Sequence, residues 1–155
     1  MALFLSTQIN KLDKKGRVSI PAQFRTELAD QSFQGVVLLP SKAHQAIEGF
    51  SWSYMRSISE RLDAFDLFSS EQDDLATSVF GLAQQLPFDG DGSITLPSDL
   101  ITYAEITEQV AFVGLGHKFQ VWDPVKLEER KQQARQSVQD NNLTIPLTVP
   151  KGQVA

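Results

Sequence analysis

Residues 10–28 read N-K-L-D-K-K-G-R-V-S-I-P-A-Q-F-R-T-E-L, and this stretch decides the fold. Asp13 can accept hydrogen bonds from the backbone ahead of it, and Gly16 tolerates a positive φ, so a tight turn is predicted between them. The alternation of polar and apolar residues over 17–20 predicts a short strand. Pro21 ends that strand and suits the first position of a helix. The stretch therefore predicts a turn, a strand and a short helix in succession.

The same pattern returns between residues 87 and 105, and a shift of 76 residues brings the two copies into register. A buried strand is predicted after each copy. The matched positions hold similar residues in the turn, in the strand and at the start of the helix: Asp13 and Asp89, Gly16 and Gly92, Val18 and Ile94, Ile20 and Leu96, Pro21 and Pro97. A duplication of this size indicates two related units that are too small to be stable alone.

We therefore predict an α+β fold in which two pseudo-symmetric β-α-β repeats share one small β core, with helices after each repeat. An edge strand is predicted over residues 4–9. The predicted division of the chain is a first repeat over 4–50, connecting helices over 51–84, a second repeat over 85–126, a C-terminal helix over 127–142 and a tail over 143–155.

The connecting segment is predicted to contain two helices. The first begins after Ser51 and continues to about Phe65. The second begins after Ser69 or Ser70, and acidic residues in its first turn suit the helix dipole. Its apolar residues recur at helical spacing and are expected to face the core: Leu75, Val79, Leu82 and Leu86.

The charges are distributed unevenly along the 155 residues, although the net charge is only −5. Residues 11–27 carry five positive and two negative side chains, whereas residues 89–105 carry four negative side chains and no positive one. Because the distribution matters more than the total, an anion-binding face is expected mainly from the first half. The absence of cysteine, of a signal-peptide pattern and of a long apolar run predicts a cytoplasmic protein without a membrane span.

The first turn carries three cations, Lys14, Lys15 and Arg17. At the tip of a hairpin, an arginine can bond O6 and N7 of a guanine together. Lysines suit phosphates, which set affinity and register but not sequence. The alternative is that Arg17 pairs with Asp13 across its own turn and that the lysines are only solvated. The residues alone leave both interpretations open.

Two further cations flank this turn. Lys11 precedes it and joins the basic group, and Arg25 follows it on the helix as a phosphate contact or a member of a structural ion pair. The second copy departs at each matched position, with Ser93 for Arg17, Gly90 for Lys14, Asp91 for Lys15 and Ile101 for Arg25. The second turn therefore cannot contribute the same contacts.

No enzyme, cofactor or metal site is predicted. His44 and His117 lack cysteine or carboxylate partners at ligand spacing, and no nucleotide-binding glycine loop or hydrolase motif occurs. Residues 89–94 resemble part of a calcium loop, but its twelfth position is a serine where a bidentate glutamate is needed. Trp52 and Trp122 lie at related places in the two repeats, which favours packing over base stacking.

The pattern D-x-K-G-R-V-x-I-P-x-x-F-R, repeated as D-x-x-G-x-I-x-L-P, resembles the MraZ family. The segments A-I-E-G-F at 46–50 and V-G-L-G-H-K-F-Q-V-W-D-P at 113–124 are also similar to that family, so the resemblance covers nearly the whole chain. It implies a swapped-hairpin β-barrel of the AbrB-like class. It further implies a ring-forming, nucleoid-associated repressor that binds double-stranded DNA at promoter repeats upstream of its own cell-division and cell-wall gene cluster.

The resemblance favours DNA contact for Arg17 over pairing with Asp13. The predicted DNA-binding residues are then Lys11, Lys14, Lys15, Arg17 and Arg25. A second hypothesis is an oligomeric assembly or interaction protein with weak or no DNA recognition, because the second copy is acidic and has no arginine at the matched position. The sequence predicts no small-molecule substrate for either function.

Overall fold

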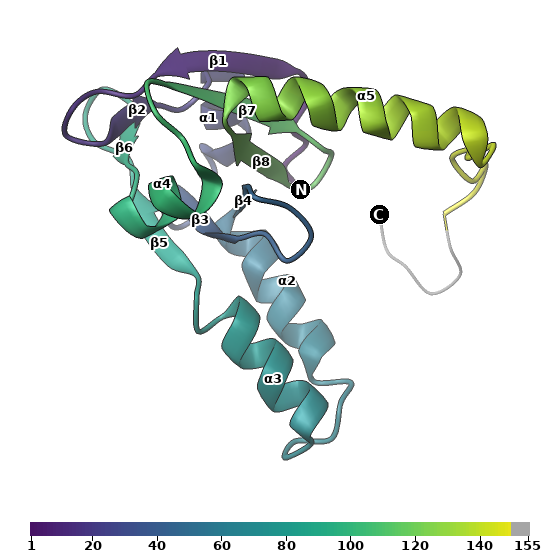
Figure 1. Ribbon diagram of the computed structural model, residues 1–155. Helices are drawn as coiled ribbons and strands as arrows, with labels where there is room; N and C mark the ends of the chain where they lie inside the picture. Colours follow the sequence, from purple (N-terminus) through teal and green to yellow (C-terminus); the bar gives the residue numbers. More distant parts are fainter. Residues whose placement is uncertain (150–155) are drawn as a thin grey trace. The chain divides into compact units, whose positions relative to one another are not determined.

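The computed structural model describes residues 1–149, and Figure 1 shows the elements along the chain. Two compact units are present, residues 1–124 and the segment from Val125 onward, and each is described by itself. The elements of the first unit are β1 (Thr7–Lys11), β2 (Arg17–Ser19), α1 (Ala22–Leu28), β3 (Gly35–Pro40), β4 (Ile47–Phe50), α2 (Trp52–Leu62), α3 (Ser70–Val79), β5 (Gln84–Pro87), β6 (Ser93–Thr95), α4 (Ser98–Ala104), β7 (Gln109–Gly114) and β8 (Phe119–Trp122).

The two repeats exchange strands. The main sheet has the order β1-β7-β8-β4-β3-β5, and all of its neighbouring strands are antiparallel. β1 of the first repeat therefore pairs with β7 of the second, while β5 of the second pairs with β3 of the first. β2 and β6 form a separate two-stranded ribbon in which Val18 lies opposite Ile94. The predicted α+β class and the sharing of one β core by both repeats are confirmed.

The apolar residues of both repeats meet in one main core. Val18 and Ile20 are at most 2% exposed, and so are their counterparts Ile94 and Leu96, which confirms the predicted inward face of each short strand. Phenylalanines from several elements fill the centre, where the Phe4 ring lies 5.1 Å from the rings of both Phe24 and Phe119. Such edge-on aromatic pairs add to the free energy gained by burial alone.

The proline after each short strand precedes the helix, whereas the sequence predicts Pro21 as the first residue of its helix. Pro21 and Pro97 are the N-caps of α1 and α4, with ψ angles of 137° and 143°, so each is still extended. Their fixed φ suits both the end of a strand and the entry to a helix. Each proline therefore marks the boundary between strand and helix, and the helix begins at the next residue.

The first strand is shorter at its start than predicted for residues 4–9. β1 begins at Thr7, and Phe4 makes only an isolated bridge with Gly116. Ser6 between them has a φ of 70°, which interrupts the extended backbone. β1 nevertheless lies at the edge of the main sheet, as predicted.

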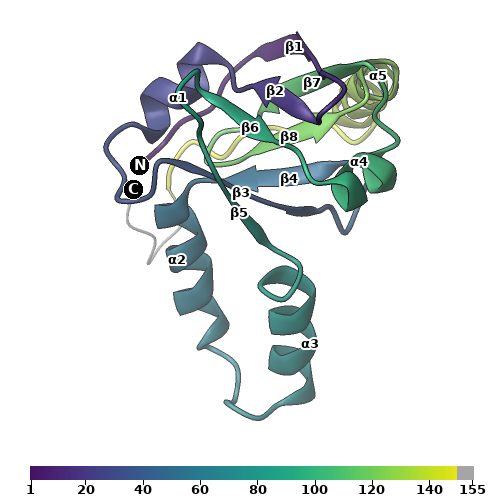
Figure 2. The same cartoon turned by 90° about the vertical axis from the view of Figure 1, so that its left-hand side faces the viewer.

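The two connecting helices begin where predicted. The Ser51 hydroxyl accepts a hydrogen bond from the Tyr54 N–H at the start of α2, and the Ser69 hydroxyl accepts one from the Gln72 N–H at the start of α3. α2 ends at Leu62, before the predicted limit. Figures 1 and 2 show the two helices as a hairpin that projects from the sheet.

The inward apolar face predicted for α3 is present only in part. Val79 is half-buried and packs against an apolar cluster on β3, β4 and α2, but α3 has no fully buried residue, and Leu75 and Leu82 are 37% and 51% exposed. The helix ends at Val79, so Leu82 and Leu86 do not lie on the helix that their spacing predicts. Leu86 belongs to β5 and packs against the main core from there.

A smaller apolar cluster joins α2 to the outer face of the sheet. Its buried members are Val37, Leu39, Phe50 and Met55, and Trp52 packs against them. Trp122 is 5% exposed, and its indole N–H donates to the Gln120 side chain at 2.9 Å. Both tryptophans therefore pack within the fold, as the sequence predicts.

The second unit consists mainly of α5 (Pro124–Asp140), which begins and ends slightly before the range predicted for a C-terminal helix, 127–142. The predicted tail is described as far as residue 149, and its apolar side chains Leu143, Ile145, Leu147 and Val149 are exposed. Residues 150–155 of that tail lie outside the described residues. Across residues 1–149, no helix is both long and apolar enough to cross a membrane.

Candidate nucleic-acid interface

The first turn is closed by one carboxylate. Asp13 Oδ1 accepts hydrogen bonds from the backbone N–H groups of Lys15 and Arg17, at 2.9 and 2.8 Å. The main chain adds bonds from the Asp13 N–H to the Arg17 carbonyl and from the Gly16 N–H to the Asp13 carbonyl. Gly16 has a φ of 84°, which explains why glycine is required there. The Asp and Gly of the motif thus build the turn, and the residues between them are free to project.

The second turn repeats this bonding at every equivalent position. Asp89 Oδ1 accepts from the N–H groups of Asp91 and Ser93, at 2.9 and 3.0 Å. The Asp89 N–H donates to the Ser93 carbonyl, the Gly92 N–H donates to the Asp89 carbonyl, and Gly92 has a φ of 76°. Asp89 and Gly92 therefore make the same hydrogen bonds in the second turn as Asp13 and Gly16 make in the first.

The ribbon of β2 and β6 brings the two turns together. The Leu96 N–H donates to the Gly16 carbonyl, and the Ile20 N–H donates to the Gly92 carbonyl, so each strand is tied to the other repeat's turn. The hydroxyls of Ser19 and Ser93 lie 3.3 Å apart across the ribbon. In Figure 2, β2 and β6 lie side by side at the same end of the first unit. The two turns therefore form one tip.

Arg17 reaches across this tip to the second turn. Its Nε and Nη2 donate to Asp89 Oδ2 at 3.1 and 2.6 Å, and Asp91 Oδ2 lies 3.5 Å from Nη2. The alternative interpretation named a different partner, Asp13, whose Oδ1 accepts hydrogen bonds from the backbone of its own turn, whereas the guanidinium bonds Asp89. The pattern within the first turn does not indicate Asp89 as the partner, because the two residues meet only through the pairing of β2 with β6.

This ion pair is accessible to solvent and to ligands. The side chains of Arg17 and Asp89 are 40% and 38% exposed. Hydrogen bonds from the Ser93 N–H and from the Arg17 guanidinium lower the pKa of Asp89 below its ordinary value. The hydrogen bond to Asp89 raises the pKa of Arg17, which therefore stays charged. Exposed pairs of this kind contribute little to stability, so a stronger ligand can compete for the guanidinium.

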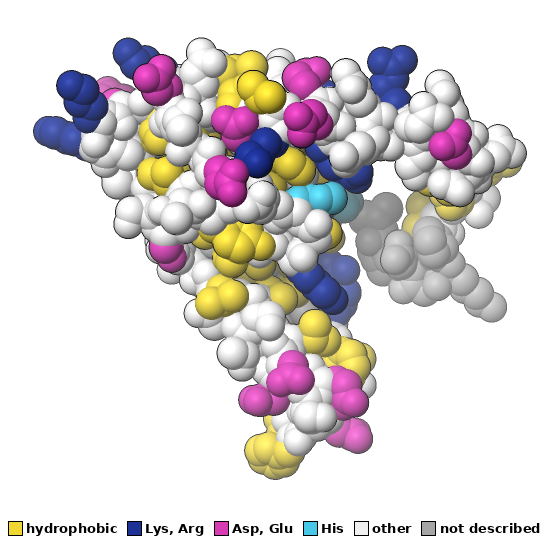
Figure 3. Space-filling model, in the orientation of Figure 1, with side chains coloured by type: hydrophobic (Ala, Val, Ile, Leu, Met, Phe, Trp, Pro, Cys, Tyr) yellow, Lys and Arg dark blue, Asp and Glu magenta, His cyan; other side chains and the backbone are white. Residues whose placement is uncertain are grey.

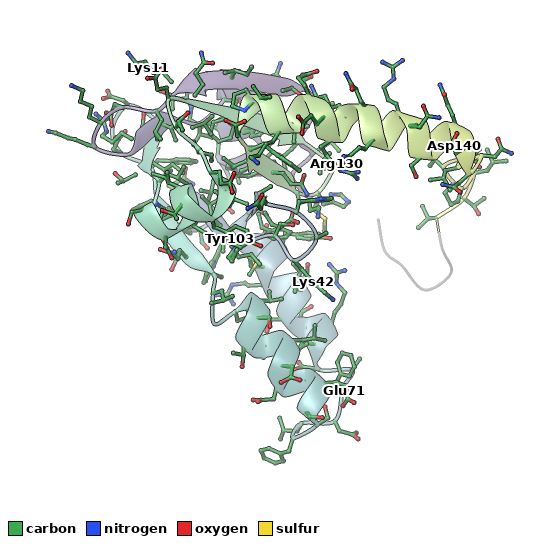
Figure 4. All side chains as sticks on the ribbon, in the orientation of Figure 1. Lys11, Lys42, Glu71, Tyr103, Arg130 and Asp140 are labelled. Atoms are coloured by element: carbon green, nitrogen blue, oxygen red, sulfur yellow. The ribbon has the colours of Figure 1, made fainter. Side chains whose placement is uncertain are left out.

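The lysines around the first turn are free of the core. Lys11, Lys14 and Lys15 are all exposed. Lys11 is the last residue of β1 and is labelled at this end of the first unit in Figure 4. Figure 3 shows Lys and Arg side chains projecting around the β1–β2 connection. Lys14 and Lys15 are thus exposed in the same turn as Arg17, and Lys11 is exposed at the end of the strand that leads into it.

Arg25 occupies a different environment. It is half-buried, and its Nε donates to the Ile20 carbonyl at 3.2 Å. A Cβ at position 92 would lie 2.7 Å from Arg25 Cδ, so the side chain packs directly on the second turn. Arg25 therefore supports the tip by packing on the second turn. Its contact with DNA stays a prediction. Asn10, which lies outside the repeated pattern of the sequence, also supports the tip, since its Nδ2 donates to the Ser19 carbonyl.

The remaining polar candidates lie elsewhere. The His117 Nδ1 is 3.1 Å from the Ala2 carbonyl oxygen, and the His44 ring lies 5.3 Å from the Trp122 ring. Within the described part of the chain, no three His, Cys, Asp or Glu side chains are arranged to hold a metal ion.

The sequence matches known proteins along most of its length. The family described as "MraZ protein, putative antitoxin-like" matches residues 3–76 and 79–144. The protein named transcriptional regulator MraZ from Gluconobacter oxydans (strain 621H) is 45% identical over 138 residues, which cover 87% of this chain and 84% of that protein. The protein of the same name from Rickettsia akari (strain Hartford) is 38% identical over 145 residues, covering 94% and 97%. With its two matched segments and the paired turns described above, the chain belongs to the MraZ family.

Proposed function

We propose that this chain is a sequence-specific, DNA-binding transcriptional regulator that works as a homo-oligomer. The observation that carries the proposal is the tip, where the exposed Lys14 and Lys15 and the partly exposed Arg17 lie on one hydrogen-bonded turn. The name that its relatives bear, transcriptional regulator MraZ, supports the same function.

The cations of the tip divide into two roles. Arg17 is assigned to base recognition, because a guanidinium can bond guanine O6 and N7 in the major groove at the same time. Lys11, Lys14 and Lys15 are assigned to phosphates, since they are exposed and flexible point charges. Arg25 supports the second turn and is the least accessible of the predicted DNA contacts.

A group of acidic residues of the first unit lies on the α2–α3 hairpin, whereas Asp13, Asp89 and Asp91 lie at the tip itself. α3 has Glu71 and Asp73 in its first turn, and Figure 3 shows acidic side chains at the far end of the α2–α3 hairpin. One group of Lys and Arg side chains lies around the β1–β2 connection, at the opposite end of the unit from these acids in that view. An approach through the tip therefore keeps the acidic end of this hairpin away from the phosphates.

A single tip is too small to bind tightly, because a few phosphate contacts give only weak affinity at physiological salt. Several tips held in a ring and spaced to meet successive promoter repeats would bind with a high effective concentration. The proposed target is the set of repeats upstream of the protein's own cell-division and cell-wall genes, where binding would repress transcription in the nucleoid.

The test is footprinting of the purified full-length protein on the region upstream of its own gene, with an Arg17→Ala variant as control. We expect regularly spaced protection by the wild type and loss of the site preference in the variant, with the same elution volume in size-exclusion chromatography. If the variant keeps the sequence preference, the role of Arg17 is wrong. If the wild type elutes as a single protomer and protects no repeats, the proposed function is wrong.

A second candidate is an assembly or interaction protein with weak or no DNA recognition. The observation that favours it is the pair of carboxylates, Asp89 and Asp91, that lie beside the guanidinium of Arg17. The two functions differ in salt dependence. Contact with several phosphates would make the DNA affinity fall steeply between 50 and 200 mM salt, roughly threefold or more for each contact. An affinity that is weak and flat over this range would favour the second candidate.

A further inference from the structure

The Asp89 carboxylate has two separate partners. Oδ1 accepts from the Asp91 and Ser93 N–H groups and so holds the second turn. Oδ2 accepts from Nε and Nη2 of Arg17 and so holds the guanidinium of the first repeat. Asp13, the equivalent residue of the first repeat, has the turn-forming role, but the residue at the position equivalent to Arg17 is the uncharged Ser93. The carboxylate of the second turn therefore binds the guanidinium of the first repeat, but the equivalent contact from Asp13 to position 93 cannot form.

The bonds to Asp89 use one edge of the guanidinium. Nε and Nη2 lie on that edge, and the group has five N–H donors in a planar fork. Apart from the long 3.5 Å contact of Nη2 with Asp91 Oδ2, the edge formed by Nη1 and Nη2 is still able to bond two acceptors, such as O6 and N7 of a guanine. An arginine side chain loses considerable rotamer entropy when it is fixed, so a side chain already held in the free protein binds with less entropic cost.

We propose that Asp89 is a positioning residue for Arg17, so that the second repeat sets DNA specificity without touching a base. This inference rests on the proposed function. Asp89 orients the guanidinium for base recognition, and its negative charge weakens the attraction of Arg17 for phosphates of any sequence. Both effects favour the specific site over other DNA.

A simple competitor would behave differently. If Asp89 only occupied the guanidinium until DNA displaced it, removing its charge would strengthen binding to every duplex and would not reduce discrimination. A positioning residue predicts that removing the charge reduces discrimination between the specific site and other DNA. The ratio of the two affinities therefore separates the two roles, whereas either affinity alone does not.

The experiment compares Asp89→Asn with Asp91→Asn in the full-length protein. Asparagine retains an Oδ1 that can accept from the backbone of the second turn, so the turn is preserved. Asp91→Asn removes the same charge from the same turn, but Asp91 is 86% exposed and only 3.5 Å from Nη2, at the limit of a hydrogen bond. The probes are a duplex containing the upstream repeats and a scrambled duplex of equal length, both measured at one salt concentration.

We expect Asp91→Asn to strengthen binding to both duplexes by the same factor and to leave their affinity ratio unchanged. We expect Asp89→Asn to lower that ratio roughly threefold to tenfold, the range expected for releasing one ordered side chain. In an Arg17→Ala background, Asp89→Asn should cause no further loss of discrimination, because the residue that it positions is absent. Thermal unfolding and size-exclusion chromatography test whether each variant keeps its fold and assembly.

The outcomes that overturn the inference are distinct from those that overturn the function. A wild type that discriminates, together with an Asp89→Asn variant that discriminates equally well, removes the positioning role and leaves the proposed function standing. A loss of discrimination that persists in the Arg17→Ala background assigns Asp89 a purely structural role. A wild type that binds both duplexes equally overturns the proposed function and this inference together.

Discussion

The two turns at the tip of the first unit have the same backbone and opposite charges. Asp13 and Asp89 make equivalent hydrogen bonds, and Gly16 and Gly92 have similar positive φ angles. The residues between each aspartate and glycine are two lysines in the first turn but a glycine and an aspartate in the second. The same turn geometry therefore forms with different residues between the shared Asp and Gly. The intervening positions are free to diverge, and their charge determines which turn suits an anion.

The largest effect is expected from the two glycines. Gly16→Ala and Gly92→Ala each force an alanine into the left-handed region, so each should lower the free energy of unfolding by about 1–2 kcal/mol. The surroundings of the two sites differ, because an added Cβ meets the Leu96 carbonyl oxygen at 3.1 Å in the first turn but the Arg25 side chain at 2.7 Å in the second. Urea unfolding of both variants measures the loss.

Removing Arg25 distinguishes the two glycine sites. An Arg25→Ala background should reduce the loss caused by Gly92→Ala, because the overlapping side chain is gone, and should leave the loss caused by Gly16→Ala unchanged. Equal behaviour of the two sites would show that Arg25 does not support the second turn specifically.

A smaller effect is expected when the second turn is given the charge of the first. Asp91→Lys places a cation at the position equivalent to Lys15, on a side chain that is 86% exposed. If the second turn faces DNA, the plot of log affinity against log salt should become steeper by about 0.9 for each added phosphate contact. Fluorescence anisotropy between 50 and 200 mM salt measures this slope. An unchanged slope would show that only the first turn approaches DNA.

The converse substitution should have a similar or slightly smaller effect. Lys14→Gln should make the same slope shallower by about 0.9 while leaving the sequence preference intact, because a phosphate contact carries no sequence information. Lys42→Gln is the matched control, since Lys42 is also exposed and Figure 4 shows it well away from Lys11. If both lysine variants change the slope equally, the tip is not the main phosphate-binding surface.

The smallest effect is expected from pH. Because the pKa of Asp89 is lowered in the folded protein, its charged form stabilises the fold above the ordinary Asp pKa of about 3.9. This contribution is lost as the pH falls through the lower, folded-state pKa. The difference in melting temperature between wild type and Asp89→Asn should therefore be constant from pH 8 to pH 5 and should shrink below about pH 4. A difference that changes mainly between pH 6 and 8 would identify another group as its cause.

Much of the fold follows from short-range chemistry that the sequence displays. The Asp and Gly of each turn, the alternation in β2 and β6 and the prolines after them all act on neighbouring residues, so the pattern predicts them. The partner of Arg17 could not be predicted in this way. Asp89 lies 72 residues further along the chain, and only the pairing of β2 with β6 brings the two side chains together. Within the turn of Arg17, the nearest carboxylate in the sequence is that of Asp13, which is why the sequence suggests Asp13 as an alternative partner.

The α2–α3 hairpin shows a second limit of the sequence pattern. Leu75, Val79 and Leu82 recur at helical spacing, but the helix ends before Leu82 and projects from the sheet. Periodicity indicates which residues share a helix face, but it does not indicate whether another element covers that face. In the candidate site, the exposure of Lys14 and Lys15 followed from their place in a turn, whereas the packing of Arg25 on Gly92 required the second repeat in position.

The exchange of β1 and β5 between the repeats has a consequence for how the two halves can evolve. In a protein assembled from two separate identical chains, a substitution at the arginine position would alter both turns at once. Here the halves are encoded in tandem and are always made in equal amounts, so one can lose its arginine while the other keeps it. Neither half could be deleted without removing an outer strand of the sheet from the half that remains. Covalent fusion thus permits asymmetric specialisation while making each half indispensable to the other.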